Sequence, residues 1–505
     1  MSPDVRQVKR RQILFLTRKS DVSLQVQLAV QLKDLIQSGQ LGAGDPLPSS
    51  RELAAELKVS RNTVVYAYER LISEGYLNSR SRSKVYVSDT ARELRSAAQR
   101  SKAHQESAPT VHVAGASYSD RPKPFRPCQP DVQLFPLALW NRLRGRALRT
   151  TNRSLLHYNS EAVLGFRPLR ENLATYLRDS RGVVCEWWQI AITTGSQQAL
   201  YLLANLLLKQ GDRVYMENPG YSGAVRAWKS AGATIEPLPI DAQGMVFPPL
   251  EDASVALVYV TPSRQFPTGA SLSLARRLAL VNGAVNTKTW IVEDDYDSEF
   301  RYIAPPLPSM QSLDSGNRVI YVGTFSKLLF PSLRLGYAVL PKSLVEPFAE
   351  LKTIAEDHGP MIDQATLAAF LDSGAFYSHI RRCRKSYAER QQAFLDAIEK
   401  GSLPLEFRYR DGGMNLTGFL PESCDDLVWS ARLKRVGLDV PALSQYASVP
   451  TERGLVFGFT AFTPAQIRRG VEKLLSLRLD RTVLSSGTAG VTRSGTLLVP
   501  GSGRI

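Results

Sequence analysis

Between residues 126 and 480, short apolar runs of strand length alternate with longer segments whose apolar residues recur at helical spacing. Two parallel strands need a long crossover connection, and a helix usually supplies it. The alternation therefore predicts an α/β domain with a mostly parallel central sheet. The apolar runs lie at residues 189–193, 213–216, 255–260, 289–292 and 319–322.

Residues 24–88 are organised differently and are typical of three short helices followed by a hairpin. Ser49 and Glu52 have the spacing of a capping box, and Ser60 can cap a further helix that ends at Gly75. Two short apolar segments then flank a polar, basic tip, which predicts two strands. The apolar positions of the first and third helices recur at i, i+4, i+7 and i+8 and are Leu28, Leu32, Leu35 and Ile36, then Val64, Tyr68, Leu71 and Ile72.

The positive charge of the chain is concentrated toward its two ends. The formal net charge is +16, and residues 1–126 carry 21 basic and 12 acidic side chains. Residues 481–505 add three arginines and no acidic residue, so the long middle segment is nearly balanced. A clustered basic excess points to an anionic partner such as nucleic acid.

Composition sets the remaining boundaries. Residues 92–125 are rich in Ala, Ser, Gln, Arg and Pro and are predicted to be a linker, and residues 481–505 are predicted to be a disordered tail. The chain thus divides into domains at 1–91 and 126–480. The longest apolar stretch is too short to cross a membrane, and four scattered cysteines indicate neither disulfides nor a metal site. We expect a cytoplasmic protein.

The helix that begins after Ser60 presents Arg61, Asn62 and Thr63 at its start. Arginine pairs with guanine and asparagine with adenine in the major groove of DNA, so this helix end is suited to reading bases. Arg51 and the arginines of the hairpin tip could contact phosphates and fix the register. From charge alone, a small helical bundle with a solvated basic face is an equally good interpretation.

These elements resemble the winged helix-turn-helix of the GntR superfamily, through LPSSRELAAEL (47–57) and VSRNTVVYAYERLISEGYL (59–77). The resemblance implies an α+β DNA-binding domain whose second helix, recognition helix and wing touch DNA. The wing tip has no glycine, so we expect arginine side chains to make the contact there. Matched residue by residue, the implied DNA contacts are Arg51, Ser60, Arg61, Asn62, Thr63, Ser81 and Arg82.

A second group of polar residues follows the apolar runs of the middle segment. Lys327 comes soon after one run, where burial would lower the pKa of its amine and favour Schiff-base formation. Glu293, Asp294 and Asp295 end another run, and a carboxylate there could hold a pyridinium nitrogen protonated. Gly195 opens an apolar helix and would bring backbone N–H groups to a phosphate. Taken alone, a lysine after a strand is usually a surface residue.

Together these segments resemble the fold-type-I aminotransferases, and more closely the aminotransferase-like domain of MocR/GabR-type regulators. The resemblance implies a pyridoxal 5′-phosphate (PLP) cofactor with Lys327 forming the internal aldimine. It also implies that Asp294 pairs with the pyridine nitrogen, although the adjacent Asp295 stays open as an alternative. The motifs are TTGSQQAL (193–200), ENPGY (217–221), TPSRQFPTG (261–269), EDDYDSEFR (293–301) and GTFSK (323–327).

The same resemblance assigns further roles around the cofactor. Tyr296 would bond the ring hydroxyl, and Tyr221 would stack on or line the ring. The implied cofactor-binding residues are Gly195, Ser196, Gln197, Tyr221, Asp294, Tyr296, Thr324, Lys327 and Arg334.

Three positions depart from the aminotransferase pattern. Val456 stands where amino-acid aminotransferases carry the arginine that binds the substrate α-carboxylate, so a bidentate clamp is missing there. Arg264 replaces a histidine common in the regulators, and Phe266 replaces an asparagine that bonds the cofactor hydroxyl. Transamination of an ordinary amino acid would need another anchor, for which the candidates are Arg301, Arg408 and Arg410.

The two resemblances imply a PLP-dependent transcriptional regulator of the MocR/GabR type. Its winged domain would bind double-stranded operator DNA, and its larger domain would form a head-to-tail homodimer that senses PLP, an amine or an amino acid. Vitamin B6 or amine and amino-acid metabolism is the expected target of control. Two alternatives stay open: an active PLP-dependent aminotransferase with a DNA-binding extension, and a scaffold that keeps the fold without the cofactor.

Overall fold

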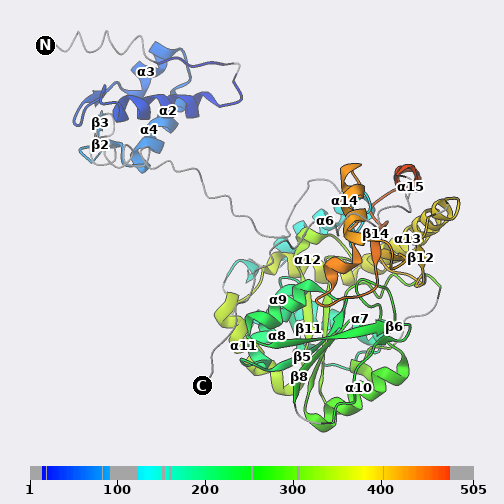
Figure 1. Ribbon diagram of the computed structural model, residues 1–505. Coiled ribbons are helices and arrows are strands. Elements are labelled where there is room, and N and C mark those ends of the chain that lie inside the picture. Colours follow the sequence, from blue (N-terminus) through cyan, green and yellow to red (C-terminus); the bar gives the residue numbers. More distant parts are fainter. Residues whose placement is uncertain are drawn as a thin grey trace, which may run out of the picture. The chain divides into compact units, whose positions relative to one another are not determined.

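The chain folds into two compact units, residues 1–117 and 118–505 (Figure 1). The computed structural model describes residues 14–18, 20–81, 84–90, 123–150, 154–157, 162–251, 254–303, 308–401 and 403–477. Most of the predicted linker and the whole predicted tail lie outside these ranges. Among the described residues, no helix is long and apolar enough to cross a membrane.

The first unit has the helices and the hairpin that its sequence predicts. Ser49 and Glu52 form the capping box at the start of the second helix, and the Ser60 hydroxyl accepts a hydrogen bond from the Thr63 N–H. Apolar residues of all three helices and of both hairpin strands form one buried core. The elements are α2 (Leu24–Gln37), β1 (Pro46–Leu47), α3 (Ser50–Leu57), α4 (Arg61–Ser73), β2 (Leu77–Ser81) and β3 (Lys84–Val87), with the sheet order β1-β3-β2.

The larger unit is built on an eight-stranded sheet with the order β4-β11-β10-β9-β8-β5-β6-β7. The strands from β10 through β6 pair in parallel, while β11 and β7 run antiparallel to their neighbours. The prediction of a mostly parallel sheet is therefore confirmed. The strands are β4 (Ile190–Thr193), β5 (Arg213–Asn218), β6 (Thr234–Asp241), β7 (Gly244–Met245), β8 (Val255–Val260), β9 (Trp290–Asp295), β10 (Val319–Thr324) and β11 (Gly336–Val339).

Helices cover both faces of this sheet because alternate strand residues point to opposite sides. On β10, Ile320 and Val322 join the cluster packed by α8, α9 and α11, whereas Tyr321 joins the cluster that contains α7. Val319 packs in a third cluster with α10. These helices are α7 (Arg167–Arg181), α8 (Ser196–Leu207), α9 (Ser222–Ser230), α10 (Leu274–Thr287) and α11 (Lys342–Glu356).

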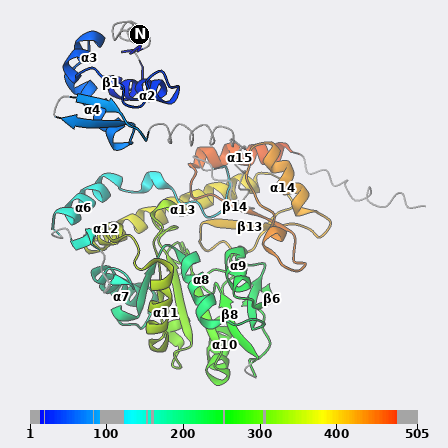
Figure 2. The same ribbon diagram turned by 90° about the vertical axis from the view of Figure 1, so that its left-hand side faces the viewer.

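A smaller subdomain follows the sheet along the chain. In Figure 2, α13 runs across the larger unit from α12 toward β13 and β14. The three strands of the subdomain are antiparallel, in the order β12-β13-β14. The remaining elements are α6 (Leu137–Thr150), α12 (Met361–Asp372), α13 (Ala375–Glu399), β12 (Glu406–Phe407), β13 (Asn415–Phe419), α14 (Asp426–Arg435), β14 (Gly454–Gly458) and α15 (Pro464–Ser476).

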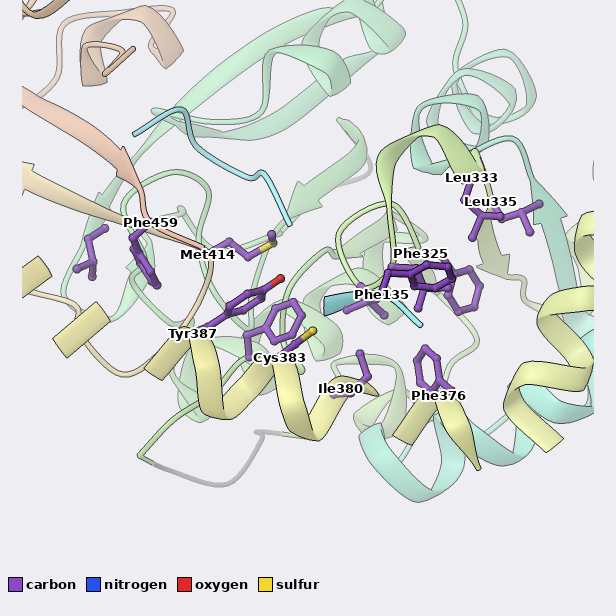
Figure 3. Packing of buried hydrophobic residues seen from close by; sticks show 14 of the residues in the cluster. Phe135, Phe325, Leu333, Leu335, Phe376, Ile380, Cys383, Tyr387, Met414 and Phe459 are labelled. Atoms are coloured by element: carbon purple, nitrogen blue, oxygen red, sulfur yellow. The ribbon is translucent and has the colours of Figure 1, made fainter. Parts of the chain in front are cut away.

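The largest buried cluster joins α13 to the sheet on one side and to the subdomain on the other (Figure 3). Phe125, the last residue of the predicted linker, is part of it. Its ring makes edge contacts with Phe394, Phe457 and Phe462, at centroid distances of 5.7, 6.0 and 6.4 Å. The Phe125 carbonyl also accepts a hydrogen bond from the Gly458 N–H. The segment that enters the larger unit is thus part of its core.

We predict that Phe125→Ala lowers the free energy of unfolding of the larger unit by about 3 to 5 kcal/mol, because it leaves a cavity among three aromatic rings. All six tryptophans of the chain lie in this unit, so urea unfolding followed by tryptophan fluorescence reports on it alone. Val184→Ala, at a side chain that is 70% exposed, is the control. Equal midpoints for both variants would contradict the prediction.

Candidate functional site

The polar residues singled out in the middle of the chain meet at the carboxyl ends of the central strands. In an open α/β sheet this edge is where ligands bind. Asp294 and Asp295 end β9, beside Val322 and Gly323 of β10. Because adjacent strand residues point to opposite faces, the two carboxylates point away from each other.

Asp295 is held in a buried network on the α7 side of the sheet. Its carboxylate accepts hydrogen bonds from the Tyr321 hydroxyl at 2.6 Å and from the Ser298 hydroxyl at 2.8 Å. It also forms an ion pair with the Arg181 guanidinium at 2.8 Å, and both side chains are almost completely buried. All of these contacts are made by one carboxylate oxygen, Oδ2, and tie Asp295 to the α7 side of the sheet.

Asp294 has a different environment on the α8 and α9 side of the sheet. One carboxylate oxygen accepts a hydrogen bond from the Tyr259 hydroxyl at 2.7 Å, and the other, Oδ1, is buried without a partner. Burial raises the pKa of Asp294 to about 7, and the nearby Lys327 partly opposes this shift. An unpaired buried acceptor of this kind is suited to a ligand that brings a hydrogen-bond donor.

Lys327 lies just beyond the end of β10. Its Nζ donates a hydrogen bond to the Cys128 carbonyl at 3.1 Å, and its charge acts on Asp294. The preceding Ser326 has a buried hydroxyl oxygen with no partner, while the Thr324 hydroxyl accepts a hydrogen bond from the Ser326 N–H. The Ser326 hydroxyl is therefore available to a ligand, and the Lys327 amine is held by a single backbone hydrogen bond.

The start of α8 forms an anion-binding end of the same site. Gly195 precedes the helix with a φ of 103°, and a Cβ atom built on it would lie 3.0 Å from the Arg334 guanidinium. The helix has no side-chain cap, so its first N–H groups are free to bind an anion. Arg334 is exposed and donates one hydrogen bond to the Thr194 carbonyl at 2.8 Å. Ser196 and Gln197 occupy the first turn of α8.

Aromatic rings line the site between these two ends. Phe266 makes edge contacts with Tyr221, Tyr296 and Tyr446, at centroid distances of 6.0, 5.7 and 5.2 Å. The Tyr221 hydroxyl donates to Gln197 at 3.1 Å, whereas the Tyr296 hydroxyl is buried without a partner. Phe266 cannot serve as that partner, because its side chain has no polar atom.

The arrangement fits the predicted cofactor. A flat pyridine ring with a phosphate needs a buried carboxylate for its nitrogen, a donor for its ring oxygen, an amine for its aldehyde and an anion site for its phosphate. The unpaired Asp294 Oδ1 and Tyr296 hydroxyl, with Lys327 and the α8 N-terminus, match these needs in chemical type. All nine residues predicted to bind the cofactor lie at this edge of the sheet or at the helix start beside it.

An arginine clamp for a substrate carboxylate is absent at the position where aminotransferases have it. Val456 is fully buried in β14 opposite Thr417. Each of the three alternative arginines has an acidic partner: Arg301 pairs with Asp411, Arg408 with Glu406 and Glu452, and Arg410 with Glu399. Arg301 uses only Nη2 for this pair, and its Nε and Nη1 are buried without a hydrogen-bond partner.

Arg264 does not supply the clamp either. It donates to the Asn415 carbonyl at 2.7 Å and lies within 4 Å of the Asp297 and Asp411 carboxylates. Arg264 and Arg301 line a cavity of about 10 Å³. That volume has room for about one water molecule and none for an amino acid.

In the first unit, the start of α4 is exposed. Arg51, Arg61 and Asn62 are on the surface, and the Arg61 guanidinium makes one long contact of 3.4 Å with Ser50. The Ser60 and Thr63 side chains bond each other in the helix cap. Arg82 and the Ser81 side chain lie outside the described residues, so their predicted role at the wing stays a prediction.

Three residues at the site in the larger unit were not identified from the sequence. Arg181 is far from Asp295 along the chain and ends an ordinary amphipathic helix. Tyr259 lies inside an apolar strand, and this pattern indicates a core residue rather than a hydrogen-bond donor. Cys128 contributes a backbone carbonyl, which any residue has. Only the tertiary fold brings these groups to the two aspartates and to Lys327.

Two protein-family models match this chain. The model described as "Bacterial regulatory proteins, gntR family" matches residues 24–87, and the model "Aminotransferase class I and II" matches residues 160–474. Among solved structures, a multiple substrate aminotransferase from Thermococcus profundus has a TM-score of 0.66 at 26% identity, over 74% of this chain and 97% of its own. The kynurenine aminotransferase of Pyrococcus horikoshii has a TM-score of 0.64 at 28% identity, over 69% and 88%.

Curated relatives match nearly the whole chain. The probable rhizopine catabolism regulatory protein MocR of Rhizobium meliloti is 36% identical, over 95% of this chain and 99% of its own length. The regulator TauR of Rhodobacter capsulatus is 34% identical over 95% and 98%, and the pyridoxine biosynthesis regulator PdxR of Corynebacterium glutamicum is 33% identical over 86% and 92%. The chain therefore belongs to the MocR-type family of transcriptional regulators, in which a GntR-type DNA-binding domain precedes a class I and II aminotransferase domain.

Proposed function

We propose that this protein regulates transcription by binding operator DNA with its first unit and PLP, with or without a further effector, in its larger unit. The observation that carries the proposal is that the larger unit has a site suited to PLP but no arginine at the position of Val456. The exposed start of α4 in the first unit is suited to reading bases. The match of regulators over nearly the full length supports it.

When bound, PLP supplies an aldehyde that reacts with amines and a ring that withdraws electrons. Lys327 would be the attachment point. Asp294 binds the ring nitrogen, and Tyr259 orients that carboxylate by its hydrogen bond. Tyr296 donates to the ring oxygen. The α8 N-terminus and Arg334 hold the phosphate, with Ser196, Gln197 and Thr324 beside it.

The effector follows from the missing clamp. Without an arginine at the position of Val456 for an α-carboxylate, PLP itself or an amine without that group is favoured over an ordinary amino acid. The relative named for control of pyridoxine biosynthesis supports PLP as a signal. We propose a head-to-tail homodimer through the larger unit, in which occupancy of the site shifts an equilibrium between two arrangements of the protein.

A working aminotransferase is the second candidate, because the solved structures that match the larger unit include enzymes of this type. The site argues against it. Val456 cannot bind a carboxylate, and Arg408 and Arg410 are paired with acidic residues.

The first prediction concerns cofactor attachment. Protein purified with excess PLP should show the visible absorbance of a lysine-bound cofactor, and Lys327→Ala should lose it because Lys327 is the lysine that follows β10 at this site. Lys342→Ala, at an exposed lysine at the start of α11, should keep the band. A band that persists in Lys327→Ala would show that the cofactor is attached elsewhere.

The second prediction concerns transamination. We expect amino acids to convert the bound cofactor slowly in single-turnover absorbance measurements, without sustained turnover when a keto acid is added. Alanine and ethylamine should react with rate constants within about tenfold of each other, because a charged clamp worth about 1.5 to 3 kcal/mol is missing. Rapid turnover with a strong preference for alanine would favour the enzyme over the regulator.

The third prediction concerns DNA. Arg61→Ala should weaken binding to the operator by about 1 to 3 kcal/mol while leaving non-specific binding nearly unchanged, because the side chain reads a base. Arg70→Ala is the matched control on the same helix, since Arg70 is paired with Glu74 at 2.8 Å. Footprinting and titration at one fixed salt concentration measure both effects. An unchanged footprint in Arg61→Ala would exclude this helix end as the base reader.

A further inference from the structure

A cavity of about 230 Å³ lies on the α7 side of the sheet, next to the network around Asp295. Its walls come from the C-terminal half of α7, the N-terminal half of α13 and the turn after β9. It shares no lining residue with the set predicted to bind PLP. Ligand pockets for drug-sized molecules measure about 300 to 1,000 Å³, so this cavity suits a molecule with a single ring.

Aromatic rings form one wall of the cavity. The ring of Tyr176 lies 5.2 Å from that of Phe376 and 6.0 Å from that of Tyr377, measured between centroids. Figure 3 shows Phe376 and Ile380 on α13, one turn apart. Tyr377 is 44% exposed although it is a large aromatic residue, so its ring stands at the opening. These surfaces favour a flat apolar group.

Two arginines provide the charge at the rim. Arg381 is exposed and makes no hydrogen bond or ion pair with the part of the chain that the structure describes. Arg384 uses only its Nε, which donates to the Glu299 carbonyl at 2.9 Å, so its terminal N–H groups can bind a ligand. The one carboxylate in the wall, Glu299, accepts a hydrogen bond from Tyr176, and burial raises its pKa. The rim therefore offers two guanidinium groups to an anion.

The floor of the cavity is part of the network around Asp295. Arg181 and Ser298 line the cavity, and both also bond the Asp295 carboxylate at 2.8 Å. Asp295 is joined by one peptide bond to Asp294, the residue proposed to bind the pyridine nitrogen. A ligand that moves Arg181 or Ser298 thus acts on the strand end that positions Asp294.

We propose that this cavity is a second small-molecule site, that it takes a single-ring aromatic carboxylate, and that its occupancy is sensed at the cofactor site through Arg181 and Asp295. The ring lies against Tyr176, Phe376 and Tyr377, and the carboxylate lies between Arg381 and Arg384. The binding part stands on the cavity alone, and the sensing part rests on the proposed function.

The test uses the full-length protein loaded with PLP and benzoate as the probe. Calorimetry measures benzoate binding, and the absorbance of the lysine-bound cofactor reports on the surroundings of Asp294. We expect benzoate to bind and to shift the absorbance band. Benzamide, which has the ring without the charge, should bind at least about tenfold more weakly, as should inorganic phosphate, which has the charge without the ring.

The double variant Arg381→Ala/Arg384→Ala should raise the Kd of benzoate by about tenfold or more, whereas Arg382→Ala, at an exposed arginine of the same helix outside the cavity, should leave it unchanged. Absence of benzoate binding at millimolar concentration, or equal affinity in the two variants, overturns the site. Binding without a change in the band overturns the sensing. If no lysine-bound band exists, the proposed function fails, and calorimetry still decides whether the cavity binds benzoate.

Discussion

Asp294 and Asp295 are neighbours in the chain at the buried end of β9, yet they serve opposite faces of the central sheet. Burying two adjacent carboxylates is costly unless each is neutralised in its own way. Asp295 forms an ion pair with Arg181 and accepts hydrogen bonds from two hydroxyl groups. Asp294 has a single hydroxyl donor and a pKa raised to about 7, so its charge awaits a partner. The geometry of the site depends on this difference between the partners of the two carboxylates.

The local structure could be read from the sequence because its signals are local. The capping box at Ser49, the cap at Ser60 and the five apolar runs each depend on residues within one turn or one strand, and the structure has all of them. The carboxyl ends of parallel strands share one edge of the sheet, so the residues that follow these strands were expected to lie close together. The choice between Asp294 and Asp295 needed the third dimension, because it depends on Arg181 and Tyr259, which no spacing in the chain connects to β9.

The partners of the candidate arginines could not be predicted from the sequence. Arg301, Arg408 and Arg410 were equally plausible carboxylate anchors by residue type, and each has an acidic partner in the fold. Arg301 still has two buried nitrogens without a partner, which residue type alone could not show. The larger unit therefore keeps the framework of an aminotransferase but has Val456 in place of the usual carboxylate-binding arginine.

The entry of the chain into the larger unit has a mechanical consequence. Phe125 is fixed in the aromatic core, its carbonyl is bonded to the end of β14, and three residues later the Cys128 carbonyl accepts the hydrogen bond from Lys327. The segment that enters the larger unit is therefore hydrogen-bonded to Lys327. Any group that binds the Lys327 amine competes with the Cys128 carbonyl for it, so the contact between this segment and the candidate site depends on what Lys327 binds.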